Sequence, residues 1–308
     1  MASLKEVKGR INSINGTLKI TSAMKMVASA KLHKAQEAIE NMLPYENRLH
    51  GILKNFLASG VSVQTPFATG KPLKKVALVA FASNSSLCGG YNANVIRHLT
   101  TLVDEYAKEV GKENVLIYPV GKKVSEAVKK MGLTVMGDFQ HLSGKPNYKE
   151  ASDLAQELMD KFLKGEIQKV DLLYNHFKST STQVLTHEPY LPLDIAAQTA
   201  AVSRKAGENN GKPEESEEAG MGFQSGDYIV EPSVKVVMKS LVPKVLRMKI
   251  YTVLLDAAAS EHAARTMAMQ IATDNANDLI QELTLIYNKS RQQAITNELL
   301  DIVGGTMA

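Results

Sequence analysis

Residues 269–303 read MQIATDNANDLIQELTLIYNKSRQQAITNELLDIV, and this stretch decides the fold. Its apolar side chains recur in steps of three and four residues, at Met269, Ala272, Ala276, Leu279, Leu283 and Ile286. So narrow a stripe is typical of a helix that packs along one partner helix. No proline or glycine occurs between Pro243 and Gly304. We therefore predict one helix from Ser233 to Val303, about 105 Å long at 1.5 Å per residue.

The partner helix is predicted at the other end of the chain. A single seam would also suit an amphipathic helix on a globular core, but two long seams favour an antiparallel two-helix coiled coil of residues 1–57 and 233–308. Thr21, Lys25 and Glu46 interrupt the N-terminal seam. The seam runs through Leu4, Val7, Ile11, Ile14, Leu18, Thr21, Lys25, Ala28, Leu32, Ala35, Ile39, Met42, Glu46, Leu49, Leu53 and Phe56.

The middle of the chain, residues 58–192, alternates short apolar runs with amphipathic segments. Such alternation predicts a mainly parallel sheet with helical crossovers, and a final hairpin adds an antiparallel edge. The fold class is therefore α/β, with a Rossmann-like domain inserted between the two arms of the coiled coil. The expected strands are 75–81, 115–118, 133–136, 170–177 and 183–187, and the expected helices are 92–110, 122–131 and 148–163.

A linker, residues 193–232, is expected between this domain and the C-terminal helix. Residues 204–222 consist largely of Gly, Asn, Pro, Glu and Ser. A segment with so few apolar side chains cannot bury enough surface to offset the entropy cost of ordering the chain. We therefore expect a flexible insertion there.

Composition and charge exclude several classes of protein. No run of residues is apolar enough to span a bilayer, and no signal peptide precedes the first heptad. The formal net charge of +4 is too small to indicate a nucleic-acid-binding protein. Its distribution is more informative, because no acid occurs among the basic residues between Val7 and Gln36, which should attract an acidic surface. These residues are Lys8, Arg10, Lys19, Lys25, Lys31 and Lys34.

Four groups of residues have side chains that could take part in catalysis or in ligand or metal binding, and we expect none of them to do so. Residues 83–92 follow the first strand, where doubly wound folds bind phosphates, but they lack the GxGxxG and GxxxxGK[ST] patterns. Cys88 is expected to be a buried, inert thiol. The hairpin histidines, His176 and His187, lack a third metal ligand. Residues 260–262, Ser-Glu-His, cannot converge as a triad, because successive helical residues point about 100° apart.

The end of the long helix is expected to project beyond its shorter partner. Residues 292–303 would extend roughly 20 Å past the N-terminal helix. Ile295, Leu299 and Ile302 still form an apolar face there, and no other part of the chain remains to cover it. We therefore expect this face to be covered by other subunits.

Five segments carry a resemblance to a known family. They are residues 4–11, 20–28, 87–92, 259–265 and 287–299, the last of which reads YNKSRQQAITNEL. Together they resemble the gamma subunits of rotary, F-type ATP synthases, over nearly the whole chain and in the family's order. The chain departs from the family pattern at Asn84-Ser85-Ser86, where Asp-Arg-Gly is usual, and at Asn297, where Gln is common.

The resemblance implies a non-catalytic shaft that turns inside a hexamer of alpha and beta subunits, next to an epsilon subunit and on a membrane ring of c subunits. It implies no cofactor, metal or nucleic acid. Met24 and Lys25 would meet the acidic lever of the beta subunits, and Tyr228 and Glu231 would lie near the foot. The upper beta-subunit contacts would be Arg291, Gln292, Thr296 and Glu298.

The resemblance also implies a peripheral location, on the cytoplasmic face of a bacterial inner membrane. The start at Met1 without a presequence favours a bacterial member, and a processed organelle protein is the alternative. Two alternatives stay open at this point. A coiled-coil arm that binds nucleic acid would use the same basic stripe, although aromatic and Arg-rich grooves are lacking. A nucleotide-dependent enzyme would need the phosphate-binding loop that residues 83–92 do not provide.

Overall fold

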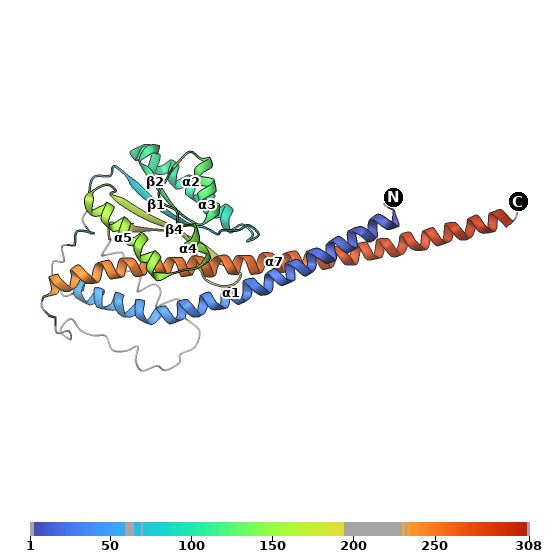
Figure 1. Ribbon diagram of the computed structural model, residues 1–308, viewed down its shortest axis with the longest axis horizontal. Coiled ribbons are helices and arrows are strands. Elements are labelled where there is room, and N and C mark those ends of the chain that lie inside the picture. The colour runs from blue at the N-terminus through green and yellow to red at the C-terminus, as the bar shows by residue number, and fades with distance from the viewer. Residues whose placement is uncertain (1–2, 59–64, 69, 194–229, 232, 307–308) are drawn as a thin grey trace.

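The protein is a long two-helix rod with an α/β domain on one side of it (Figure 1). A computed structural model describes residues 3–58, 65–68, 70–193, 230–231 and 233–306. Helix α1 (Leu4–Ala58) and helix α7 (Val234–Thr306) run antiparallel along the rod, with both chain ends at the same end of the molecule (Figure 1). The predicted coiled coil is confirmed, and α7 is about 110 Å long at 1.5 Å per residue.

The seam between α1 and α7 follows the predicted positions. Val7, Ala28 and Leu32 of α1 are buried, as are Met269 and Ala276 of α7. Two of the three interruptions are buried as well, namely Thr21 and Glu46. The Thr273 hydroxyl of α7 donates a hydrogen bond to the Thr21 hydroxyl across the seam, at 3.0 Å. Each hydroxyl also lies within hydrogen-bond distance of a carbonyl of its own helix, Thr21 of Leu18 and Thr273 of Met269, so both are paired inside the seam. A polar pair of this kind favours one register of two helices.

The α/β domain contains one five-stranded sheet in the order β3-β2-β1-β4-β5. Strands β1 (Val76–Phe81), β2 (Val115–Val120), β3 (Thr134–Val135) and β4 (Lys169–Phe177) are parallel neighbours. Strand β5 (Gln183–Leu191) pairs antiparallel with β4, as the predicted hairpin requires. Pro189 is tolerated in β5 because an edge strand has one side without ladder hydrogen bonds.

Helices cover both faces of the sheet. On one face, α2 (Tyr91–Val110) and α3 (Lys122–Lys130) pack on Val76, Leu78 and Ala80. On the other face, α4 (Gln140–Gly144), α5 (Tyr148–Lys164) and α7 pack on Ala77 and Val79. Every residue of β1 is therefore buried, as a continuous apolar run predicts. Helix α7 is thus shared by the rod and by the core of the domain (Figure 1).

The predicted elements agree with the observed ones to within a few residues, with two differences. The sequence did not predict α4 or the 3-10 turn η1 (Lys112–Asn114), because both are too short to show a period. Strand β5 continues to Leu191, four residues beyond the predicted His187, along its register with β4. The predicted insertion, residues 204–222, and nearly all of the linker lie outside the described residues.

Replacing Leu32 by alanine should destabilise the rod. Leu32 is 6% exposed and packs on Ala259 and Ala263 of α7. Removing a buried leucine from such a contact costs about 2–3 kcal/mol of unfolding free energy. Urea unfolding of the purified chain, followed by circular dichroism, measures the loss. The same substitution at Leu43, which is 47% exposed on the same helix, serves as the control, and an equal loss at both positions would contradict the expected seam.

Candidate functional site

The carboxyl edge of the parallel strands, where related folds bind phosphates, is occupied by contacts with α7. Arg265 of α7 donates from Nη2 to Ser85 Oγ at 2.8 Å, in the loop after β1. Arg265 is held in turn by Glu261, at 2.6 Å between Nη1 and Oε1, and both side chains are largely buried. A Cβ on Gly89 of the same loop would lie 3.9 Å from the Ala268 side chain. The loop therefore serves as a docking surface for α7, and its contacts take the place that a phosphate would need.

Cys88 is buried, as predicted. Its Sγ lies 3.2 Å from Asn92 Nδ2 and 3.8 Å from Ser83 Oγ. Neither partner is a base, so the geometry offers no means of activating the thiol as a nucleophile.

The two hairpin histidines do not face each other. In the strand register His176 lies opposite Val184, and His187 lies opposite Leu173. His176 Nδ1 pairs with Asp256 at 2.6 Å, while His187 Nε2 pairs with Asp171 at 2.9 Å. Across the described part of the chain, no group of three His, Cys, Asp or Glu side chains is arranged to hold a metal ion.

The Ser-Glu-His sequence of α7 forms no triad. The Ser260 hydroxyl donates to the Asn175 carbonyl at 2.8 Å, and Glu261 binds Arg265. His262 Nδ1 is buried without a hydrogen-bond partner. Burial lowers the pKa of His262 to about 4, and the charges of Arg265 and Lys31 add to the shift. The imidazole is therefore neutral at pH 7.

Four further side-chain contacts attach the sheet to α7. Asp256 accepts hydrogen bonds from the Phe177 amide at 2.7 Å and pairs with His176 at the end of β4. The hydroxyls of Tyr91 and Tyr190 donate to the α7 carbonyls of Ala257 and Leu246, both at 3.0 Å. Because these bonds reach α7 from three separate segments, the domain and the rod are joined as one body.

The two α1 residues that the resemblance assigned to contacts with the beta subunits are only partly exposed. Met24 and Lys25 are half-buried beside α7. Their neighbours Met26 and Val27 are more open, at 73% and 56% exposed. Sequence reasoning missed these two, because the seam pattern marks only the buried positions. Between Val7 and Gln36 of α1 the exposed Lys and Arg residues are Lys8, Arg10, Lys19, Lys31 and Lys34.

The tip of the rod, defined here as residues 291–303 of α7, projects past the N-terminal end of α1 (Figure 1). Its predicted apolar face is exposed, with Ile295 at 48%, Leu299 at 57% and Ile302 at 64%. Leu300 and Val303, which the sequence reasoning missed, widen that face, at 63% and 55% exposed. The predicted contact residues of the tip are all exposed as well, namely Arg291, Gln292, Thr296 and Glu298.

Of the two predicted foot residues, the structure describes one. Glu231 is exposed just before α7 begins, at the end of the rod opposite the tip (Figure 1). Tyr228 lies outside the described residues, so its predicted place near the foot is untested. Within the described chain, none of the helices is long and apolar enough to cross a membrane.

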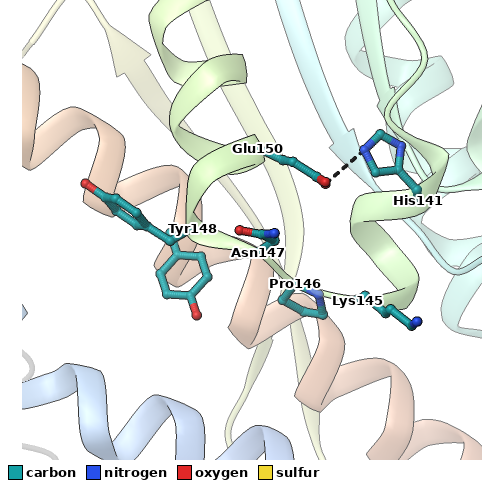
Figure 2. A pocket seen from close by; sticks show the side chains of 7 residues that line it. His141, Lys145, Pro146, Asn147, Tyr148 and Glu150 are labelled. Carbon is teal, nitrogen blue, oxygen red and sulfur yellow. Dashed lines mark ion pairs between the residues drawn. The ribbon is translucent and has the colours of Figure 1, made fainter.

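An open hollow of about 550 Å³ lies between α4, the start of α5 and α7 (Figure 2). His141 and Glu150 pair at 2.9 Å on one side of it, and Lys145 lies nearby. The rings of Tyr148 and Tyr251 meet edge to face on the other side, with centroids 5.6 Å apart. His141, Tyr148 and Glu150 are all substantially exposed. The hollow therefore lacks the buried, convergent polar groups of an active site.

Comparisons with known proteins agree with this arrangement. A family model described as ATP synthase matches residues 3–308. The chain is 65% identical to a protein of Phocaeicola vulgatus and 58% identical to one of Bacteroides fragilis, both named ATP synthase gamma chain and both aligned over the full length of both chains. Among solved structures, a chain of the Euglena gracilis mitochondrial ATP synthase is 18% identical, with a TM-score of 0.59 over 99% of this chain and 94% of that one. A Tetrahymena thermophila central stalk chain is 24% identical, with a TM-score of 0.56 over 82% and 99%.

Acid should destabilise the protein partly through His262. The unfolded side chain binds a proton below about pH 6.5, whereas the folded one stays neutral down to about pH 4. The free energy of unfolding therefore falls as the pH drops through this window, by about 2 kcal/mol after allowance for partial exposure. Urea unfolding at pH 6.5 and pH 4 should show a smaller fall for His262→Leu than for the parent chain. His33→Leu, at an exposed position of α1, should keep the full fall; equal falls for both variants would refute the assignment.

Proposed function

The chain belongs to the ATP synthase family whose curated members are named ATP synthase gamma chain, and we propose that it is the central rotor shaft of an F-type ATP synthase. It would couple rotation of the membrane c-ring, driven by proton flow, to ATP synthesis in the alpha/beta hexamer, or run in reverse as an ATP-driven pump. The chain itself is non-catalytic. The observation that carries this proposal is a long two-helix rod whose apolar tip is exposed.

The exposed tip argues for a surrounding sleeve of other subunits. Isolated apolar side chains are common on protein surfaces, but five on two and a half turns of one helix form a patch that water solvates poorly. Helix α7 is not apolar enough over a sufficient length to cross a membrane, and no described segment of this chain covers the patch. The alpha/beta hexamer, closed around the end of the rod, would bury it.

The mechanism requires asymmetry and stiffness, and it requires no catalytic residue in this chain. A two-helix rod lacks threefold symmetry, so at any angle it presents a different side to each of three surrounding beta subunits. Each subunit would then favour a different conformation and a different nucleotide affinity, and rotation would exchange these states. The absence of a phosphate-binding loop at residues 83–92 agrees with this division of labour, because the nucleotides would be bound by other subunits.

The side of the rod offers the contacts that would transmit force. Lys25 and the exposed basic residues of α1 would face the acidic lever of the beta subunits, together with Met24 and the more exposed Met26 and Val27. At the tip of the rod, a beta-subunit loop would meet four exposed residues, namely Arg291, Gln292, Thr296 and Glu298. The charge on α1 is suited to this role, because its acids lie outside the stretch from Val7 to Gln36.

The opposite end of the molecule would rest on the c-ring. Glu231, and Tyr228 in the preceding segment, would lie near that foot, with the epsilon subunit beside the α/β domain. Similar chains in solved structures come from assemblies described as central stalk with c-ring and as F1 with c-ring. The protein would accordingly be attached to the cytoplasmic face of the bacterial inner membrane through the c-ring.

Reversing the charge of Lys25 should impair coupling. In the assembled complex, Lys25→Glu would place an anion against the acidic lever, and we expect the ratio of protons pumped to ATP hydrolysed to fall about twofold or more, since like charges in contact repel. Inverted membrane vesicles allow both rates to be measured on one sample. Lys129→Glu, an equal charge change on the exposed side of α3, is the control. Pumping that is unaffected by Lys25→Glu would contradict the predicted contact.

Softening the rod near Leu32 should reduce the torque. Ser29 and Ala30 are exposed neighbours of the buried seam, so replacing both with glycine leaves the seam packing intact. Two glycines weaken the local helix by about 1–2 kcal/mol. ATP-driven rotation of a probe attached to the rod should then deliver less torque. Ser29→Ala, which strengthens the helix, should leave the torque unchanged, and equal torque in all three proteins would mean that stiffness here is unimportant.

A further inference from the structure

The end of strand β4 reaches the rod where α1 and α7 lie side by side (Figure 1). Phe177, the last residue of the strand, packs against a buried cluster that joins the two helices. The cluster consists of Leu32 from α1 and of Ala259 and Ala263 from α7. Alanine side chains are short, so larger side chains from both neighbours can pack closely on α7 at this level. The sheet, α1 and α7 therefore meet at Phe177.

Helix α7 holds the end of β4 by two side chains one turn apart. Asp256 accepts a hydrogen bond from the Phe177 amide at 2.7 Å and pairs with His176 Nδ1 at 2.6 Å. The Ser260 hydroxyl, which is fully buried, donates to the Asn175 carbonyl at 2.8 Å. The Asp256 side chain is only 15% exposed, and a hydrogen bond to a carboxylate is about twice as strong as one between neutral groups. Three successive residues of β4 are thus fixed on α7.

The α/β domain supports α1 at two levels. Leu49 and Leu53, near the C-terminal end of α1, are buried in the large core of the domain. The cluster at Leu32 lies about 25 Å further toward the N-terminus, at 1.5 Å per residue. Among the described residues of α1, those before Leu32 belong to none of the hydrophobic clusters shared with the domain. Phe177 therefore marks the domain's support of α1 nearest the tip of the rod.

We propose that Asp256 positions Phe177 as a lateral support for α1. Apolar contact between two helices is non-directional, so a seam resists separation of the helices but lets one roll around the other. A third element packed against the seam from one side removes this freedom. Phe177 supplies that element, and the bonds of Asp256 to its amide and to His176 hold it in place. Asp256 is thus a positioning residue that acts through Phe177.

The consequence for function rests on the proposed role as a rotor shaft. The residues of α1 that would meet the beta subunits, 24–27, precede Leu32 by about two turns. A sideways push on them would roll α1 around α7 unless the domain opposed it. With Phe177 in place, the push passes into the α/β domain, and from there toward the end of the molecule that would rest on the c-ring.

Distances between two spin labels in the full-length chain test the support directly. Labels attached through Ala30→Cys, on the exposed side of α1, and Thr101→Cys, on the exposed side of α2, report where α1 lies relative to the domain. A Cys88→Ser background leaves these two as the reactive thiols. Phe177→Ala should widen the distribution of distances about twofold, because a segment held by fewer buried contacts moves more. An unchanged distribution would overturn the proposal.

Three further variants separate the support from general stability. Phe139→Ala removes a half-buried phenylalanine that stacks on Tyr118 of β2, so it should leave the distribution unchanged. Asp256→Ala should widen the distribution as Phe177→Ala does, whereas Asp256→Asn keeps an oxygen that accepts from the Phe177 amide and should restore the narrow one. If Phe177→Ala fails to fold, Phe177→Leu, which keeps part of the apolar contact, takes its place. Equal widening by Phe139→Ala would contradict the assignment.

The assembled complex tests what the support does. In inverted membrane vesicles, Phe177→Ala should lower the ratio of protons pumped to ATP hydrolysed while ATP hydrolysis itself continues, and Phe139→Ala should leave the ratio unchanged. A ratio that Phe177→Ala does not change would overturn the inferred path of force. A parent chain that failed to assemble with an alpha/beta hexamer would count against the proposed function and leave the distance result standing.

Discussion

The burial of one apolar stripe of α1 against one of α7 is the interaction on which the rest of the structure depends. The two helices come from opposite ends of the chain, so their pairing joins the N-terminal and C-terminal parts of the described chain in one body. In proteins most helical stability comes from the packing of an apolar face rather than from helix propensity. Each helix therefore supports the other, and the α/β domain rests on both through α7.

Helix α7 has two roles at once, because it belongs both to the rod and to the core of the α/β domain. In its N-terminal half α7 covers one face of the sheet. It closes the carboxyl edge through Arg265, Asp256 and the Ala257 carbonyl that accepts from Tyr91, and its Leu246 carbonyl accepts from Tyr190 beside the opposite end of β4. That edge is where doubly wound domains place their ligands. In this protein it holds the domain on the rod, which is what a shaft needs in order to pass torque from one part to the other.

The burial of side chains is uneven along the seam between α1 and α7. From Ala28 toward the C-terminal end of α1, the seam is buried, and α7 is bonded to the α/β domain there. Bending this part of the rod would therefore cost the loss of buried contacts. Toward the N-terminus of α1 burial is less complete, because residues 8–20 are exposed or half-buried and, of the described residues before them, only Val7 is buried. The exposed apolar tip and the basic side of α1 both lie on the end that would be enclosed by the hexamer, where partner subunits would supply the missing contacts.

The sequence by itself determined the coiled coil, the α/β class and the projecting tip, because heptad spacing, apolar runs and helix length are properties of the chain read in order. It also determined that Thr21 and Glu46 belong to the seam, since spacing places them there whatever their polarity. Only the tertiary structure decided that Asp256 and Arg265 anchor the sheet to α7, that His176 and His187 bind separate carboxylates, and that Met26 and Val27 are more exposed than Met24. Those facts depend on how distant segments pack in three dimensions, and no local periodicity in the chain records which partners such side chains will meet.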